Sequence, residues 1–463
     1  MNRQGPGTIA FVTLGCKVNQ ADSASMSAAL AAAGWQIVPV TAGAEPPQVI
    51  VVNSCTVTAR AAAKSRQAAR SYAARFPDSH VVLAGCYPQV APGEAAAIPG
   101  LAAVAGTGRL DTVRMLGNFA RPGSVGFVEA GPESIACGTG LLAGSRAGLA
   151  PVTEFERLPA ALVDNRVRAY LKVQDGCESA CAYCVVPRAR GRQRSQPLAE
   201  CLAEARRLLT AGARELVLTG IRLGAYGRDL ADGSSLAVLI EQCASLDGLL
   251  RLRLSSLEPI DLTMDVLAAM TQSPRICRHL HLPLQSGSDR MLRLMQRGYD
   301  TAAFARLVAS ARALVPGLAI STDVMVGFPG ETEEEYYETV GFVQRIGFMR
   351  LHVFPYSARP GTRAASLPGQ LPRNVKQERA RALIATGAGL ALEHHRQLVG
   401  TSQSVLLETD ACSLGGAVFA GQGLTEGYVR ATIELPGPAE GGSLVQANIV
   451  AAREDGVEGR AAQ

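Results

Sequence analysis

Long apolar runs and lysine are what this chain of 463 residues has least of. No apolar run reaches the roughly eighteen residues that a membrane-spanning helix needs, which excludes such a helix and makes the cytoplasm the expected location. Arginine outnumbers lysine 41 to 4 and the formal net charge is only +5, so the total charge by itself indicates no polyanionic partner. A hydrophobic content of 48% with 18% charged residues is typical of a folded chain.

Cysteine usage excludes a second class of protein. Eleven is an odd number, and the expected location is reducing, so a full disulfide framework is excluded. The length favours two or three domains. Five cysteines occur singly, and we expect them to be structural: Cys137, Cys201, Cys243, Cys277 and Cys412. The other six form two sets of three.

The first part of the chain alternates short apolar strands with alanine-rich helices. We expect strands at 8–14, 48–53 and 80–85, and helices at 22–33 and 58–75. This order predicts an N-terminal α/β domain over residues 1–116, with a parallel sheet and helices on both faces. Residues 117–165 are rich in Gly, Pro and Ser and are expected to be a linker.

Six β/α units follow over residues 166–399 and predict a partial (β/α)6 barrel, whose chemistry would lie at the carboxyl ends of its strands. A long helix at 373–399 ends this domain. Residues 400–463 are predicted to form a small all-β domain and tail. The expected barrel strands are 168–174, 214–219, 250–255, 278–283, 318–326 and 350–354, and the expected strands of the last domain are 404–408, 427–434 and 444–450.

The first set of cysteines, Cys177, Cys181 and Cys184, lies in one loop after a predicted strand. A structural zinc site or an electron-transfer cluster would usually have four ligands, and no fourth cysteine or histidine lies near. In a 4Fe–4S cluster, three ligands leave one iron open to chelate the amino and carboxylate groups of S-adenosylmethionine. Reduction of the bound sulfonium then yields methionine and a 5′-deoxyadenosyl radical. We therefore predict a catalytic cluster here, with zinc or a purely structural role as the alternative.

The second set, Cys16, Cys55 and Cys86, is spread along the chain, but each cysteine follows a predicted strand. In a parallel sheet those positions meet at one edge. Three scattered small hydrophobic residues in tight turns are the alternative. We predict that these cysteines hold a second 4Fe–4S cluster, whose open iron would carry sulfur.

With these motifs in place, the chain resembles the radical S-adenosylmethionine superfamily at Cys177, Cys181 and Cys184. Over nearly its whole length, except residues 117–165, it resembles the methylthiotransferases. Several phrases are similar to the branch that acts on threonylcarbamoyladenosine in tRNA (MtaB type): Thr13-Leu-Gly-Cys16-Lys-Val-Asn-Gln20, Asn53-Ser-Cys55-Thr-Val-Thr58, Leu171-Lys-Val-Gln-Asp-Gly-Cys177 and Val186-Pro-Arg-Ala-Arg-Gly-Arg192.

The resemblance implies an enzyme that inserts a methylthio group at C2 of N6-threonylcarbamoyladenosine at position 37 of tRNA. It also implies two 4Fe–4S clusters, S-adenosylmethionine, a tRNA anticodon stem-loop as substrate and an electron donor such as flavodoxin or ferredoxin. No membrane partner is expected, and we expect a monomer. The alternatives are a sister enzyme acting on isopentenyladenosine in tRNA, a relative that modifies a ribosomal-protein aspartate, and a non-catalytic iron–sulfur or zinc protein that binds RNA.

Further residues are expected to bind S-adenosylmethionine. The resemblance places Tyr183 against the adenine, although an aromatic there could equally be loop packing. Polar residues and glycines follow the later barrel strands and could meet the amine, ribose, carboxylate or adenine, with a cap or a salt bridge as the alternative for each. They are Gly220, Glu258, Gln285, Asp323 and Gly327.

Arginines after the first cysteine set are expected to contact RNA, since guanidinium groups pair with phosphate and stack on bases. They are Arg188, Arg190, Arg192 and Arg194. The last domain, implied to be a TRAM-type RNA-binding module, departs from this logic. After Arg396 the chain holds three arginines against eight acidic residues, a net charge of about −5. Shape recognition or packing on the barrel then remains as its role.

Overall fold

The structure is a computed structural model that describes residues 6–41, 45–120, 149–162, 167–415 and 418–462. Much of the predicted linker at 117–165, with Cys137, lies outside these ranges. The domain boundaries at residues 116, 165 and 399 stay predictions. No helix among the described residues is both long and apolar enough to cross a membrane.

The N-terminal sheet is parallel and has the strand order β2-β1-β3-β4-β5 within the described residues. Its central strand β3 is wholly buried and rich in β-branched residues, as in a sheet covered on both faces. Helices α1 and α5 pack on one face and α2 on the other, which confirms the predicted α/β arrangement. The elements are β1 (Thr8–Thr13), α1 (Lys17–Ala32), β2 (Gln36–Ile37), β3 (Val49–Ser54), α2 (Ala59–Arg75), β4 (His80–Gly85), α3 (Cys86–Val90), α4 (Pro92–Ala96), β5 (Ala103–Val104) and α5 (Arg109–Gly117).

Six further parallel strands form the predicted partial barrel. They pair as two sheets of the described chain, β10-β9-β6 and β11-β12-β13, which isolated bridges between Leu252 and Ile276 and between Ser256 and His281 join. The strands are β6 (Arg168–Lys172), β9 (Glu215–Thr219), β10 (Arg251–Leu254), β11 (His279–His281), β12 (Ala319–Val326) and β13 (Arg350–Pro355), and a short pair, β7 (Gln174–Asp175) and β8 (Arg194–Ser195), adjoins them. All six strands overlap their predicted ranges.

Helices cover the outside of this half-barrel. Local sequence sets their ends: Thr332 and Glu335 form a capping box at the start of α12, and Gly347, with φ 66°, ends it. The helices are α6 (Val186–Arg190), α7 (Leu198–Thr210), α8 (Leu236–Ala244), α9 (Met264–Thr271), α10 (Asp289–Leu294), α11 (Thr301–Leu314), α12 (Glu333–Ile346) and α13 (Arg373–Leu398), with short 3-10 turns at Leu223–Ala225, Pro259–Asp261 and Arg363–Ser366.

The C-terminal strands form a closed barrel, because β14 pairs with both β18 and β16. The sequence did not indicate β15, β16 and β19. Gly421 and Gly423 interrupt the hydrophobic pattern of β16, yet each lies where a side chain would strike the neighbouring strand β14. The strands are β14 (Ser402–Leu407), β15 (Cys412–Gly415), β16 (Val418–Thr425), β17 (Arg430–Leu435), β18 (Leu444–Arg453) and β19 (Gly456–Ala461).

Arginines of β10 bind the acidic C-terminal barrel to the half-barrel. Arg251 Nη1 donates to the Leu424 carbonyl at 2.6 Å. Arg253 is buried, pairs with Glu215 at 2.9 Å and lies 4.5 Å from the ring centroid of Tyr428. Packing on the barrel, one of the two roles left open for this domain, is therefore what the structure shows.

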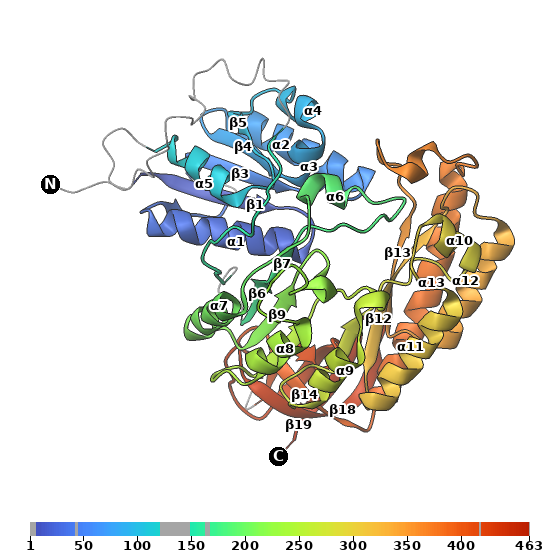
Figure 1. Cartoon of the computed structure of the whole chain (residues 1–463). Helices are drawn as coiled ribbons and strands as arrows, with labels where there is room; N and C mark the ends of the chain where they lie inside the picture. The colour runs from blue at the N-terminus through green and yellow to red at the C-terminus, as the bar shows by residue number, and fades with distance from the viewer. Residues whose placement is uncertain (1–5, 42–44, 121–148, 163–166, 416–417, 463) are drawn as a thin grey trace.

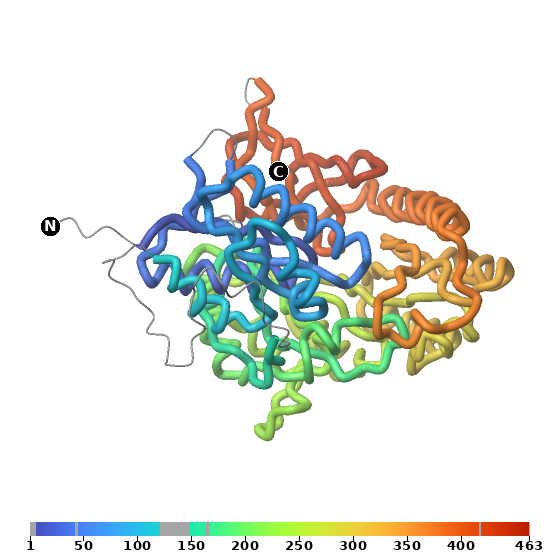
Figure 2. The backbone as a smooth tube through the Cα atoms, turned by 90° about the horizontal axis from the view of Figure 1, so that it is seen from above, coloured from blue at the N-terminus to red at the C-terminus, as the bar shows by residue number. Residues whose placement is uncertain are grey.

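The parts are stacked as Figure 1 shows. The N-terminal sheet (blue) lies on one side of the half-barrel (green to orange), and the C-terminal strands (red) lie on the other. From above, blue segments overlap green ones, and orange α13 leads to the red strands (Figure 2). Among the single cysteines, Cys412 is exposed, so only the other described ones are buried as expected: Cys201, Cys243 and Cys277.

Candidate active site

The N-terminal sheet brings Cys16, Cys55 and Cys86 together at its carboxyl edge. Strands β1, β3 and β4 are parallel neighbours, and each cysteine follows one of them. The Sγ atoms of Cys16 and Cys86 lie 3.9 and 4.0 Å from the same atom, Asn19 Oδ1. A side chain at Gly15 would lie 3.1 Å from Cys55 Sγ, so glycine there allows the thiols to approach. The geometry is the one predicted from strand order.

Burial makes two of these thiols reluctant to ionise without a metal. It raises the pKa of Cys55 and raises that of Cys86 to about 11, although the Arg190 guanidinium opposes the shift in both. Metal binding requires thiolates, and a bound cation supplies the charge that displaces the proton. The nearby arginine and the sulfur donor set therefore fit a metal cluster.

The first set of cysteines occupies the loop that follows β7. Backbone N–H groups of Ser179 and Val186 donate to the sulfurs of Cys177 and Cys184, each at 3.4 Å. Burial raises the pKa of Cys184 to about 12. Amide donors directed at sulfur stabilise thiolate ligands, so this loop also fits a cluster.

The described residues contain no group of three Cys, His, Asp or Glu side chains placed to hold one metal ion. A 4Fe–4S cluster does not need such convergence, because each cysteine binds a different iron atom.

Arg297, just after α10, lies at the first cysteine site and was not predicted. Its Nη1 donates to Cys181 Sγ at 3.1 Å and to Tyr183 Oη at 3.3 Å, and its Nη2 pairs with Glu258. Arg297 thus links Glu258 and Tyr183 to Cys181, but the ion pair of Glu258 is also the salt bridge named as its alternative role, so the roles of both residues stay predictions. No sequence motif marks Arg297, since the fold alone places it beside a loop more than a hundred residues earlier.

The other predicted S-adenosylmethionine residues lie in varied surroundings: Gly220, Gln285 and Gly327 follow β9, β11 and β12, whereas Asp323 lies inside β12, opposite His352 of β13. Gly220 packs against Gln174, where a side chain would approach Oε1 to 2.8 Å. Gln285 has φ 69° and a buried Oε1 without a partner in the described chain. Asp323 lies 3.2 Å from His281 Nε2, and Gly327 faces the stem of Lys376. Their roles stay predictions.

The four arginines expected to contact RNA divide into two kinds. Arg188 and Arg192 are exposed, whereas Arg190 and Arg194 are buried at 2% and 6% exposure. Both buried guanidinium groups already pair with aspartates, Arg190 with Asp22 and Asp175 and Arg194 with Asp175, so neither is available to a phosphate. The RNA-contact prediction is therefore wrong for Arg190 and Arg194 as placed, and it is kept for Arg188 and Arg192.

Arg190 instead joins the two cysteine sites. Its Nη1 lies 2.7 Å from Asp22 and 3.3 Å from Asp175, and its Nη2 donates to Asn19 at 2.6 Å. Burial alone would raise the pKa of Asp22, but Lys172 and Arg190 outweigh it and hold that pKa below its usual value. Asp22 and Asn19 belong to α1, which starts beside Cys16, while Asp175 precedes Cys177.

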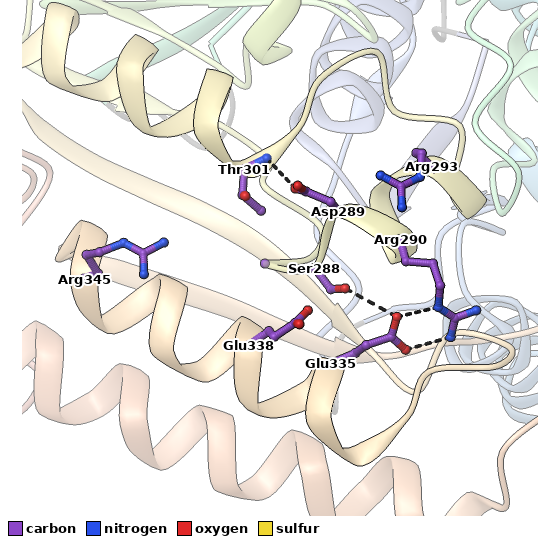
Figure 3. Close-up of a pocket in the computed structure, with 9 residues that line it drawn as sticks. Ser288, Asp289, Arg290, Arg293, Thr301, Glu335, Glu338 and Arg345 are labelled. Atoms are coloured by element: carbon purple, nitrogen blue, oxygen red, sulfur yellow. Dashed lines mark hydrogen bonds and ion pairs between the residues drawn. The ribbon is translucent and has the colours of Figure 1, made fainter.

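A separate polar pocket lies between α10 and α12 and has a volume of about 470 Å³. Figure 3 shows Arg290 forming a two-point ion pair with Glu335, at 2.6 and 2.8 Å. None of the predicted site residues lines this pocket. It is not part of the candidate active site.

Comparisons with known proteins agree with this geometry. Residues 171–343 match the Radical SAM superfamily, and residues 8–106 match the Uncharacterized protein family UPF0004. The threonylcarbamoyladenosine tRNA methylthiotransferase MtaB of Bacillus subtilis is 39% identical over 84% of this chain and 82% of its own length. The chain belongs to the radical S-adenosylmethionine methylthiotransferases. MtaB of Thermotoga maritima is 33% identical over 98% of both chains.

Other radical S-adenosylmethionine methylthiotransferases are about as similar. The tRNA-2-methylthio-N(6)-dimethylallyladenosine synthase of Thermobifida fusca is 35% identical over 85% of this chain and 76% of its own. Among solved structures, the radical S-adenosylmethionine methyltransferase TsrM of Kitasatospora setae shares the fold, with a TM-score of 0.54, 17% identity and coverage of 87% of this chain and 81% of that one. The methylthiotransferase family uses S-adenosylmethionine and 4Fe–4S clusters, and this chain is a transferase of that kind.

Changing Arg297 to glutamine is expected to reduce the cleavage of S-adenosylmethionine by about 10- to 100-fold, the usual effect of losing an outer-shell partner of a metal ligand. Arg297→Lys keeps the charge but not the forked donor, and should fall between. The measurement is 5′-deoxyadenosine release by chromatography. Arg293→Gln, on the exposed face of α10, is the matched control. If Arg297→Gln cleaves S-adenosylmethionine at the wild-type rate, the contact between Arg297 and Cys181 is not needed for cleavage.

Proposed function

We propose that this methylthiotransferase acts on N6-threonylcarbamoyladenosine at position 37 of tRNA and converts it to the 2-methylthio derivative. The observation that carries the proposal is the 39% identity with the Bacillus subtilis enzyme, together with the two cysteine sets at the strand ends. We further propose that residues 1–116 hold the sulfur-carrying cluster, residues 166–399 the radical chemistry, and residues 400–463 a domain that packs on the barrel.

The chain's own residues would hold and orient the reacting groups. When bound, the clusters supply electrons to S-adenosylmethionine and a site for the transferred sulfur. Gln174 Nε2 donates to the carbonyls of Asp175 and Gly176 at 2.8 and 2.7 Å, which fixes the loop that enters Cys177. Of the two residues held by Arg297, Glu258 would bond ribose or carboxylate oxygens of S-adenosylmethionine and Tyr183 would lie against its adenine. Exposed Arg188 and Arg192 would contact the anticodon stem-loop.

The second candidate substrate is isopentenyladenosine in tRNA, because the Thermobifida fusca relative, a tRNA-2-methylthio-N(6)-dimethylallyladenosine synthase, is 35% identical. Both reactions need the same two cysteine sets, so the cysteines do not separate them. A cytoplasmic location, a monomeric state and a flavodoxin or ferredoxin as electron donor are part of the proposal.

Nucleoside mass spectrometry of tRNA from a deletion strain tests the substrate. We expect 2-methylthio-N6-threonylcarbamoyladenosine to disappear and its precursor to accumulate, because C2 is the atom modified. A plasmid copy should restore the product, and a copy carrying Cys181→Ala should not. Loss of the methylthio derivative of isopentenyladenosine would support the second candidate instead. Unchanged tRNA would refute both and direct attention to a ribosomal-protein substrate.

A further inference from the structure

The loop after β13 joins the half-barrel to the second cysteine site. Arg359 Nη2 donates to Thr56 Oγ1 at 2.6 Å, and Thr56 is the residue after Cys55. Two residues earlier in the loop, Ser357 Oγ accepts from the Ala59 backbone N–H at 2.9 Å. Arg359 therefore lies where the barrel mouth meets the edge of the N-terminal sheet.

Arg359 is a buried arginine that forms no ion pair with an acidic side chain among the described residues. Buried Arg251 forms none either, but both of its Nη atoms donate to carbonyls, of Leu424 and Ser404. Arg359 is 8% exposed, and its Nε is buried without a hydrogen-bond partner within the described ranges. Arg190 and Arg253, by contrast, pair with Asp or Glu at 2.7 and 2.9 Å. Glu94 is near enough to oppose the lowering of the Arg359 pKa, but its printed hydrogen bond is with Tyr87. A desolvated cation without an ion pair is unfavourable, so the surroundings of Arg359 favour an incoming anion.

Two more arginines approach the same loop from other parts of the chain. Arg188 Nη1 donates to the Pro360 carbonyl at 2.6 Å and crosses Gly361, whose missing side chain leaves room for the guanidinium. Arg66, on α2, lies over the Tyr87 ring at 5.4 Å and is close enough to Arg359 for repulsion to lower the pKa of Arg359, an effect second to burial. No ion pair to Arg66 or Arg188 occurs in the described part of the chain. Cations that repel one another are brought together when an anion binds between them.

We propose that Arg359, with Arg66 and Arg188 beside it, binds an oxyanion of the substrate RNA. The oxyanion is either the carboxylate of the threonylcarbamoyl group or a backbone phosphate next to the modified nucleoside. A guanidinium fork pairs with both groups in two-point geometry. Contact with Thr56 sets this anion near Cys55, so binding would hold the target base against the second cysteine site. Binding of the threonylcarbamoyl carboxylate rests on the proposed function, whereas binding of a backbone phosphate does not.

Binding of anticodon hairpins by the anaerobically reconstituted enzyme tests the proposal. Fluorescence anisotropy would compare a hairpin that carries N6-threonylcarbamoyladenosine with one that carries adenosine. If Arg359 binds the carboxylate, the wild type prefers the modified hairpin by about tenfold or more and Arg359→Gln loses that preference. If it binds a phosphate, Arg359→Gln weakens both hairpins equally and the salt dependence falls by about one counterion. Arg359→Lys should retain part of the affinity in either case.

Arg306→Gln, an exposed change on α11 with the same loss of charge, should bind both hairpins like the wild type. Thermal unfolding and iron content of each variant show whether it is folded and loaded. Unchanged binding of both hairpins by folded Arg359→Gln would overturn the proposal, and unchanged binding with altered iron content would assign Arg359 to the cluster instead. If the wild type shows no preference for the modified hairpin, Arg359 does not bind the threonylcarbamoyl carboxylate, and the proposed substrate is also called into question. Binding of a backbone phosphate would still be tested by the affinity and salt dependence of Arg359→Gln.

Discussion

Replacing Cys86 by alanine is expected to abolish methylthiolation while leaving the cleavage of S-adenosylmethionine intact. Cys86 follows β4, at the carboxyl edge of the N-terminal sheet, and its sulfur lies with that of Cys16 at Asn19. The loop that holds Cys177 is a different structure, fixed by its own amide donors and by Gln174. Losing one ligand of the second set should therefore remove the sulfur-carrying site alone.

The measurement is paired. 5′-Deoxyadenosine should form at close to the wild-type rate, and no 2-methylthio nucleoside should be detected in the same reaction. Cys181→Ala is the converse variant and should lose both products, because it removes a ligand of the first set. Cys243→Ala, a buried cysteine of α8 away from both sets, controls for the loss of a thiol. Full methylthiolation by Cys86→Ala would eliminate the second-cluster interpretation.

Replacing Arg190 by glutamine is expected to destabilise the junction between the two cysteine sites by about 3–5 kcal/mol, the usual effect of breaking a buried ion pair from one side. The change leaves Asp22 and Asp175 with fewer counter-charges at positions that are 3% exposed each. Lysine should not restore stability, because one ammonium group cannot reach Asp22, Asp175 and Asn19 together.

Hydrogen exchange of α1 and of the loop before Cys177 is the direct measurement, since both should lose protection together. Arg192→Gln, exposed and two residues away, should change stability by no more than about 0.5 kcal/mol. A double-mutant cycle with Asp22→Asn gives the coupling between the two charges. Wild-type protection in Arg190→Gln would mean that the remaining cations, Lys172, Arg109 and Arg194, are sufficient to hold the junction.

Local patterns carried most of the fold. Strand-and-helix alternation predicted β1, β3 and β4 and all six barrel strands because buried parallel strands are short apolar runs. The pattern failed where side chains carry little hydrophobic signal. Strands β2 and β5 are two residues long, and glycines break up β16.

The two cysteine sites also differ in the kind of sequence pattern that predicted them. The spacing of Cys177, Cys181 and Cys184 marks the first cysteine site by itself, because a single loop can present all three thiols. For Cys16, Cys55 and Cys86, strand order was enough to predict convergence, since parallel neighbours end at one edge.

What the tertiary structure alone decided is the role of the arginines. In the sequence, Arg188, Arg190, Arg192 and Arg194 form one basic run that resembles an RNA-binding surface. In the fold, a five-residue helix turns Arg190 inward toward Asp22 and leaves Arg188 and Arg192 in solvent. The contacts of Arg297 and Arg359 could not be predicted from the sequence, because their partners Cys181 and Thr56 are more than a hundred residues away. The sequence alone thus determined where the two sets of cysteines lie. Only the tertiary packing determined which arginines lie beside them.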